Sequence, residues 1–190
     1  MKVLGIAGSP RRNGNTDLLL AELLKGAADR GAEVETIILN DLKFILCQHC
    51  DACHKTGKCK YDDDMQAIYR KLAAADRVVL ASPVQFMGVT AQTKAMIDRC
   101  QALWARKYVL NLPPLGNKRW RKGFFISVSA QKKADLFQPS LATVKALFAT
   151  LDISYAGGLF FPGVDEKGDI IKHPGALKQA YFAGQKLVED

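Results

Sequence analysis

Short apolar runs alternate with longer amphipathic stretches along the whole chain. The apolar runs predict strands at residues 2–7, 33–39, 77–81, 123–128 and 154–160. Apolar residues at helical spacing predict helices at residues 16–30, 65–75, 90–104, 140–151 and 175–188. Gly31 ends the first helix, and Asp62, Asp63 and Asp64 open the second, where carboxylates suit the helix dipole.

Strands that alternate with helices indicate βαβ units and a parallel sheet covered on both faces. We therefore predict an α/β fold with a doubly wound five-stranded parallel sheet of flavodoxin type, in the order 2-1-3-4-5. Residues 1–190 form a single domain, in which residues 43–61 are a cysteine-rich insertion after strand 2. A ligand is expected beyond the carboxyl ends of the strands, near the switch between strands one and three.

The composition is that of an ordinary globular protein, with 48% hydrophobic and 24% charged residues. No apolar run reaches the roughly 18 residues of a membrane span. The N-terminus leads from a strand into a glycine turn and shows no signal-peptide cleavage region. We expect a cytoplasmic protein without membrane attachment, in which thiols stay reduced.

The turn after the first strand is rich in hydrogen-bond donors and ends where the first helix begins. It reads Gly8-Ser9-Pro10-Arg11-Arg12-Asn13-Gly14-Asn15-Thr16. The free N–H groups and the dipole of a helix N-terminus favour an anion, and the Ser, Asn, Thr and Arg side chains suit phosphate. The turn is neither a P-loop nor a dinucleotide glycine motif. It indicates a phosphate site, with a capped turn of purely structural purpose as the alternative.

The loop after the third strand would lie beside this turn at the switch point. It reads Ser82-Pro83-Val84-Gln85-Phe86-Met87-Gly88-Val89-Thr90. Its backbone amides could bond the polar edge of a flat ring, with Phe86 and Met87 packed on that ring. The alternative is that Phe86 and Met87 are core residues.

Four of the five cysteines fall within thirteen residues, at Cys47, Cys50, Cys53 and Cys59. Thiolates are soft ligands for iron–sulfur clusters and for zinc. Zinc sites usually pair two separated knuckles, whereas three crowded cysteines and a fourth suit a cuboidal cluster better. A [4Fe-4S] cluster is the preferred interpretation, with a structural metal such as zinc and a metal-free group of thiols as alternatives. Cys100 is interpreted as a buried small side chain.

The net charge of +8 is unevenly distributed, because residues 105–133 contain no Asp or Glu. The basic residues of that stretch are Arg106, Lys107, Lys118, Arg119, Arg121, Lys122, Lys132 and Lys133. They indicate a solvated basic loop or a docking face for an acidic redox partner or an anionic cofactor. Nucleic-acid binding is not expected, because no recognition motif accompanies the charge.

Both strand-end loops, together with Lys94-Ala95-x-Ile97-Asp98-Arg99, resemble the NAD(P)H-dependent FMN reductase superfamily. With the four cysteines, the chain resembles the iron–sulfur flavoprotein branch of that superfamily. The resemblance implies FMN and a [4Fe-4S] cluster held by Cys47, Cys50, Cys53 and Cys59. The implied FMN contacts are Ser9, Arg11, Asn13, Asn15 and Thr16 around the phosphate, Pro83, Val84, Gln85, Phe86, Met87 and Gly88 around the ring, and Ser129. It also implies a homodimer or homotetramer.

Two positions depart from the resemblance. Gln85 stands where relatives often carry Tyr, which removes an aromatic ring near the flavin. The loop after the fourth strand, residues 127–131, lacks the glycines that relatives often have there, which weakens the case for flavin contacts from this loop.

We therefore expect an FMN-dependent oxidoreductase that passes electrons between a donor and an acceptor through FMN and the cluster. The donor is NAD(P)H or a ferredoxin-like carrier, and the acceptor is a small molecule or another protein. Because the cofactor carries the chemistry, no side chain is expected to be catalytic. The alternatives are an NAD(P)H:FMN or quinone reductase without a cluster, and a non-enzymatic electron carrier or redox sensor.

Overall fold

The computed structural model describes residues 1–114, 116 and 120–189. A five-stranded sheet in the order β2-β1-β3-β4-β5 forms its centre. The strands are β1 (Lys2–Ala7), β2 (Glu33–Ile38), β3 (Arg77–Ala81), β4 (Arg121–Ser129) and β5 (Ile153–Pro162). Every neighbouring pair is parallel. The predicted doubly wound, flavodoxin-like sheet and its strand order are confirmed.

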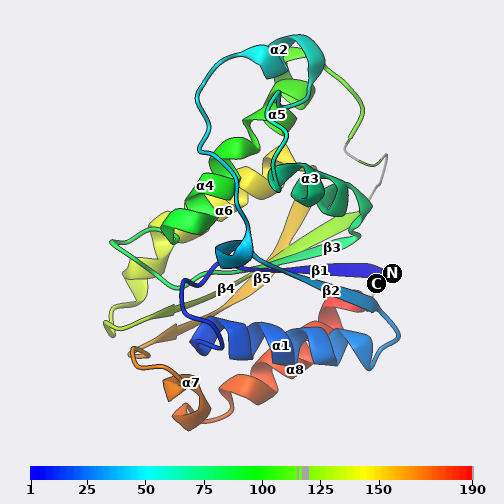
Figure 1. Cartoon of the computed structure of the whole chain (residues 1–190). Coiled ribbons are helices and arrows are strands. Elements are labelled where there is room, and N and C mark those ends of the chain that lie inside the picture. The colour runs from blue at the N-terminus through cyan, green and yellow to red at the C-terminus, as the bar shows by residue number, and fades with distance from the viewer. Residues whose placement is uncertain (115, 117–119, 190) are drawn as a thin grey trace.

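Helices cover both faces of the sheet (Figure 1). On one face α1 (Asn15–Ala28) packs against α8 (Ala176–Val188), and both bury apolar side chains against the sheet. On the other face α3 (Met65–Ala74), α4 (Ala91–Arg99) and α6 (Gln138–Thr150) enclose the second apolar core. Because both faces are covered, the central strand β3 is buried at every position.

Several short helices are not predicted by the sequence pattern. They are η1 (Leu39–Asp41), α2 (Ala52–Thr56), the π-helix η2 (Ala105–Val109), η4 (Ala134–Phe137) and α7 (Asp169–Lys172). The single helix predicted over residues 90–104 is divided at Cys100 into α4 and α5 (Gln101–Trp104). No helix among the described residues is long and apolar enough to cross a membrane.

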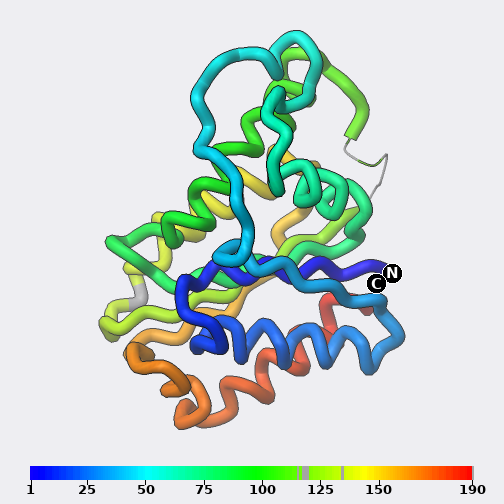
Figure 2. Tube along the Cα trace, in the orientation of Figure 1, coloured from blue at the N-terminus to red at the C-terminus, as the bar shows by residue number. Residues whose placement is uncertain are grey.

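Residues 43–61, which we call the cysteine segment, leave the sheet after η1 and return at α3 (Figure 2). The short helix α2 stands at the tip of the segment and packs against α5 and η2. Lys43 holds the two ends together, because its N–H donates to Asp64 Oδ2 at 2.7 Å and its carbonyl accepts the Asp64 N–H at 3.3 Å. The segment is thus a projection with a closed base.

Candidate functional site

Buried hydroxyl groups tie together the loops at the carboxyl ends of β1, β3 and β4. Thr90 Oγ1 donates to Gly8 O, and the Thr90 N–H donates to Ser82 Oγ at 3.1 Å. Ser127 Oγ donates to Ser82 O at 2.7 Å. Position 8 requires glycine, because a Cβ there would lie 1.9 Å from Thr93 Oγ1. These contacts fix the two predicted switch-point loops side by side.

A pocket of about 220 Å³ opens between these loops, and we call it the strand-end pocket. Its lining includes the predicted cofactor-binding residues Ser9, Arg11, Asn15, Thr16, Pro83, Val84 and Gln85. It is completed by Pro10, Gly14, Val128, Ala130, Val164, Asp165 and Lys167. The other predicted cofactor-binding residues, Asn13, Phe86, Met87, Gly88 and Ser129, do not line it. The structure therefore brings the two predicted loops together around one pocket, but not every residue predicted on them.

The N-terminus of α1 presents an unused hydrogen-bond donor to the strand-end pocket. No side chain caps this helix, whose N-cap residue is Gly14. Thr16 lines the pocket, is 1% exposed, and its Oγ1 has no hydrogen-bond partner among the described residues. A buried hydroxyl without a partner costs about 1–3 kcal/mol, which a bound acceptor would offset. A phosphate fits this place, because it accepts hydrogen bonds and is favoured by the helix dipole.

Asn15 connects the start of α1 to the loop that follows β5. Its Nδ2 donates to Glu166 O at 2.8 Å. Its Oδ1 accepts the N–H groups of Gly168 at 3.0 Å and Ile170 at 3.2 Å. The side-chain amide is thus engaged within the protein, which gives Asn15 a role in holding the loop beside the pocket.

The loop held by Asn15, residues 163–168, is the part of the site that the sequence did not predict. We call it the β5 loop. Arg11 also holds it, because Arg11 Nη1 donates to Asp165 O at 3.0 Å. The loop brings Val164, Asp165 and Lys167 to the strand-end pocket. In the sequence this loop is marked by a glycine at each end, Gly163 and Gly168, and both adopt positive φ.

Residues 85–88 form a tight turn beside the strand-end pocket. The N–H and carbonyl groups of Gln85 and Gly88 bond each other in both directions, at 2.9 and 2.8 Å. Phe86 and Met87 occupy the tip with φ of 46° and 62°, a region that non-glycine residues rarely adopt. Phe86 is fully exposed and Met87 is half exposed, so the alternative that they are core residues is wrong.

The four clustered cysteines line one small pocket, which we call the cysteine pocket. Cys47, Cys53 and Cys59 are partly buried and Cys50 is exposed, all as free thiols. Burial, and after it the neighbouring cysteine sulfurs, raise the pKa of the Cys53 thiol, which donates to Gln101 O at 3.9 Å. Within residues 1–114, 116 and 120–189, no three His, Cys, Asp or Glu side chains are arranged to hold a metal ion. Four thiols are suitable ligands for a metal that binds thiolates. Their sulfur atoms are not arranged to ligate one in this structure.

A buried ion pair joins the two ends of the cysteine segment. Arg99 Nη1 donates to Asp63 Oδ2 at 2.7 Å and to Ile45 O at 2.6 Å. Asp63 also accepts the N–H groups of Ile45 at 3.2 Å and Met65 at 3.1 Å. Burial alone would raise the pKa of Asp63, but the hydrogen bonds from Arg99 and from these amides lower it. The sequence predicts Asp63 only as a residue that opens a helix, because its partner lies on another element.

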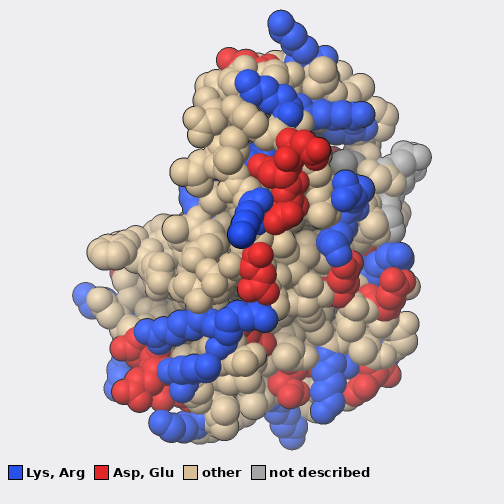
Figure 3. Space-filling view, viewed as in Figure 1, with Lys and Arg blue, Asp and Glu red and all other residues tan. Residues whose placement is uncertain are grey.

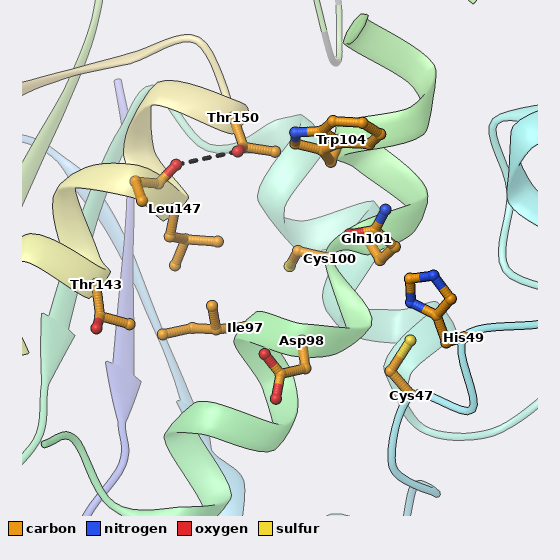
Figure 4. A pocket seen from close by; sticks show the side chains of 11 residues that line it. Cys47, His49, Ile97, Asp98, Cys100, Gln101, Trp104, Thr143, Leu147 and Thr150 are labelled. Atoms are coloured by element: carbon orange, nitrogen blue, oxygen red, sulfur yellow. Dashed lines mark hydrogen bonds between the residues drawn. The ribbon is translucent and has the colours of Figure 1, made fainter. Parts of the chain in front are cut away.

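A larger hollow of about 520 Å³ lies between the cysteine segment and the helices α4, α5 and α6 (Figure 4). Its lining includes Ile97, Asp98, Trp104, Thr143, Leu147 and Thr150. Cys47, His49 and Gln101 line both this hollow and the cysteine pocket, so the two are neighbours. Cys100 also lines the hollow, but burial raises the pKa of its thiol to about 12, which keeps the thiol protonated.

Among the described residues, the basic stretch of residues 105–133 contains buried as well as exposed side chains, and Lys132 and Lys133 are exposed. Arg121 is 1% exposed and donates to the main-chain carbonyls of Leu72, Ala75 and Leu151, so its inclusion in a docking surface is wrong. Lys107 pairs with Asp152 at 2.6 Å. The predicted basic residues Lys118 and Arg119 lie outside the described residues.

Exposed lysines are also found on the cysteine segment, at Lys55, Lys58 and Lys60. Figure 3 shows Lys and Arg side chains over the α2 end of the molecule.

The sequence matches the NADPH-dependent FMN reductase family over residues 1–149. The chain therefore belongs to this family of FMN-dependent oxidoreductases. It is 42% identical over 194 residues to an iron-sulfur flavoprotein of Archaeoglobus fulgidus, a match that covers 100% of this chain and 80% of that protein. This likeness places the chain in the iron–sulfur flavoprotein branch of the family, which confirms the resemblance inferred from the motifs.

Other relatives match over a shorter part. An iron-sulfur flavoprotein of Methanocaldococcus jannaschii is 47% identical over 103 residues, which is 54% of this chain and 53% of that protein. The chain thus matches about half the length of that relative. Among solved structures, a flavone reductase has a TM-score of 0.75 at 24% identity. The match covers 98% of this chain and 62% of the flavone reductase chain. An NAD(P)H:quinone oxidoreductase from Methanothermobacter marburgensis has a TM-score of 0.73 at 14% identity. The match covers 100% of this chain and 98% of the oxidoreductase chain. These structures share the fold.

Proposed function

We propose that the protein is an FMN-dependent oxidoreductase that passes electrons between a donor and an acceptor through FMN and a [4Fe-4S] cluster. The observation that carries this proposal is that one chain holds two distinct pockets, one with the chemistry to bind a phosphate and one with the chemistry to bind a metal cluster. The strand-end pocket contains an unpartnered buried Thr16 hydroxyl at a helix N-terminus. The cysteine pocket contains four free thiols.

In the strand-end pocket, Thr16 and the first turn of α1 would hold the FMN phosphate. The Thr16 hydroxyl is the unpartnered donor, and the helix dipole adds to the attraction. Asn15 and Arg11 would act by holding the β5 loop against the pocket. Pro83, Val84 and Gln85 line the side where the flavin ring would lie. Bound FMN supplies both hydride and single-electron chemistry, so the protein has to provide binding and orientation.

In the cysteine pocket, Cys47, Cys50, Cys53 and Cys59 would ligate the cluster through their thiolates. Cys100 would take no part, because its thiol is buried under α4 and α5 and stays protonated. The raised pKa of Cys53 reflects burial and four sulfurs in one place, and a metal cation would remove this electrostatic cost by binding the thiolates.

The electron donor would be NAD(P)H or a small ferredoxin-like carrier. The exposed Lys55, Lys58 and Lys60 favour an acidic protein partner that docks at the cysteine segment. Such docking would bring the partner close to the four thiols.

The second candidate is an NAD(P)H:FMN or quinone reductase without a cluster. It is favoured by the finding that no three His, Cys, Asp or Glu side chains of the described residues are arranged to hold a metal ion. In that case the four cysteines would be a group of reduced thiols or would hold a structural metal.

The test is anaerobic reduction of the purified protein, followed by the flavin absorption band. One arm supplies NADH or NADPH and the other a reduced acidic ferredoxin. A variant with Lys55, Lys58 and Lys60 changed to Gln should react normally with NAD(P)H but more slowly with the ferredoxin, with a weaker dependence on salt. The control changes Lys25, Lys178 and Lys186, on the helices of the opposite face, to Gln. Flavin that no donor reduces would contradict the proposal, and a cluster-free protein that still turns over NAD(P)H would favour the second candidate.

A further inference from the structure

Arg99, at the end of α4, is a charged side chain that the fold places against the cysteine pocket. It is 1% exposed, lines that pocket, and its Nη2 donates to Cys59 Sγ at 3.4 Å. Asp63 lies on the other side of the guanidinium, where it accepts from Nη1 at 2.7 Å and from Nη2 at 3.0 Å. The guanidinium therefore stands between a carboxylate and one of the four cysteine sulfurs.

One donor of this guanidinium is unused. Arg99 Nε is buried and has no hydrogen-bond partner among the described residues. An unpartnered charged donor in the protein interior is costly, and such groups are rare in folded proteins. The groups around the guanidinium include Asp63, the carbonyl of Ile45 at 2.6 Å from Nη1, and the ring of Tyr61, whose centroid lies 5.6 Å from Arg99 Cζ. Arg99 also lines the cysteine pocket, so an acceptor bound there would lie beside the guanidinium.

A thiolate-bound iron–sulfur cluster supplies acceptors of this kind. Its sulfur atoms accept weak hydrogen bonds, and hydrogen bonds to sulfur, net charge and solvent exposure together set its reduction potential. One-electron reduction adds one negative charge to the cluster, and no bond is made or broken. A buried cation beside it stabilises the reduced form more than the oxidised form.

We propose that Arg99 sets the reduction potential of the cluster, raising it through its positive charge and its hydrogen bonds to sulfur, and that Asp63 moderates this effect. The proposal rests on the proposed function, because it requires the cluster. Asp63 is the moderator because its carboxylate accepts from both Nη atoms, one of which also donates to Cys59 Sγ, and so partly neutralises the guanidinium. Arg99 thus acts as a tuning and positioning residue. By setting the cluster potential, it determines how an electron is distributed between flavin and cluster at equilibrium.

The test is an anaerobic redox titration of the purified holoprotein, in which cluster and flavin are followed separately by electron paramagnetic resonance and by absorption. The variants are Arg99→Gln, Arg99→Lys and Asp63→Asn, with Arg30→Gln as the control. Arg30 is an exposed arginine that pairs with Glu189 at 3.3 Å, so its loss removes the same charge far from the cysteine segment.

We expect Arg99→Gln to reduce the equilibrium constant for cluster reduction by about tenfold, which is about 59 mV for a one-electron couple. Arg99→Lys keeps the charge but loses the fork of donors, so it should lie between Arg99→Gln and the wild type. Asp63→Asn should shift the potential in the opposite direction, because it removes the neutralising carboxylate. The flavin potential, and both potentials of Arg30→Gln, should match the wild type.

Asp63→Asn decides the question if the Arg99 variants fail to fold or to hold iron, because it creates no cavity and keeps one acceptor oxygen. A raised cluster potential in Asp63→Asn then supports the proposal. An unchanged potential in a cluster-loaded Asp63→Asn or Arg99→Gln variant overturns it and leaves Arg99 a structural anchor. A wild-type protein that holds flavin but no iron would overturn the proposed cluster itself, which is a distinct result.

Discussion

Asn15 Oδ1 lies 3.0 Å from the backbone nitrogen of Gly168, so the start of the first helix holds the loop that follows the last strand. The same side chain accepts the Ile170 N–H and donates to Glu166 O. Asn15 therefore shapes the strand-end pocket from a distance, through a loop that contributes Asp165 and Lys167 to the lining.

Asn15→Ala should weaken FMN binding by about 1–3 kcal/mol, since it removes hydrogen bonds that hold the β5 loop. Riboflavin, which lacks the phosphate, should lose affinity as well, because the loop and not the phosphate contact is disturbed. Isothermal titration of the apoprotein with both ligands makes the comparison, with Gln179→Ala, an exposed amide on α8 outside the pocket, as the control. A loss confined to FMN would instead assign Asn15 to the phosphate directly.

Thr16→Val should weaken FMN binding without lowering the stability of the apoprotein. The Thr16 hydroxyl has no partner among the described residues, so its removal should leave the apoprotein as stable as the wild type or slightly more stable. FMN binding should weaken by about 1 kcal/mol, the usual net worth of one hydrogen bond. Thermal unfolding of the apoprotein and FMN titration measure the two effects, and Thr16→Ser should restore binding. Unchanged FMN affinity in Thr16→Val would place the phosphate elsewhere.

The parts of the structure that follow from local pattern could be predicted from the sequence. Apolar runs bounded by glycine turns predict the five strands and their order, because parallel strands with helices on both faces leave few arrangements. The turn at Ser9 to Thr16 likewise predicts a donor-rich pocket at the start of α1. The helix pattern over residues 90–104, by contrast, gives no sign of the break at Cys100.

The contacts between distant segments could not be predicted. Asn15 has the same side chain whether it bonds a phosphate or the backbone of Gly168, and only the fold decides. Arg121 looks like any other basic residue in its stretch, yet the fold buries it against main-chain carbonyls. The pairing of Arg99 with Asp63 joins the last residue of α4 to the segment just before α3, and their spacing in the sequence carries no signal.

The Asp63–Arg99 pair should make the base of the cysteine segment sensitive to acid. The pKa of Asp63 is lower in the folded protein than in the unfolded chain, so its contribution to stability is present above about pH 4 and is lost as pH falls through the folded value. Urea unfolding of the apoprotein at several pH values between neutral and strongly acidic should show the wild type more stable than Asp63→Asn. This difference should shrink in acid. A difference that is independent of pH would contradict the assignment of the lowered pKa to Asp63.

Exposed apolar side chains around α5 and η2 favour self-association. Trp104, Tyr108 and Val109 are all more than a third exposed, and Trp104 and Tyr108 lie with ring centroids 5.6 Å apart. Aromatic residues at the surface are enriched in interfaces. Light scattering should give a dimer or tetramer of the 20.9 kDa chain, and Tyr108→Arg should lower that mass, whereas Phe182→Arg on α8 should not. A wild type that stays at 20.9 kDa at micromolar concentration would exclude the homo-oligomer.

The central claim is that one chain carries both FMN and a cluster, and the most direct measurement is the content of flavin, iron and acid-labile sulfide after anaerobic purification. The wild type should contain about one FMN, four iron and four sulfide per chain. Single Ser variants of Cys47, Cys50, Cys53 and Cys59 should lose iron and keep FMN, because the two pockets are separate, whereas Cys100→Ser should keep both. Flavin without iron in the wild type, or zinc at about one per chain, would contradict the claim.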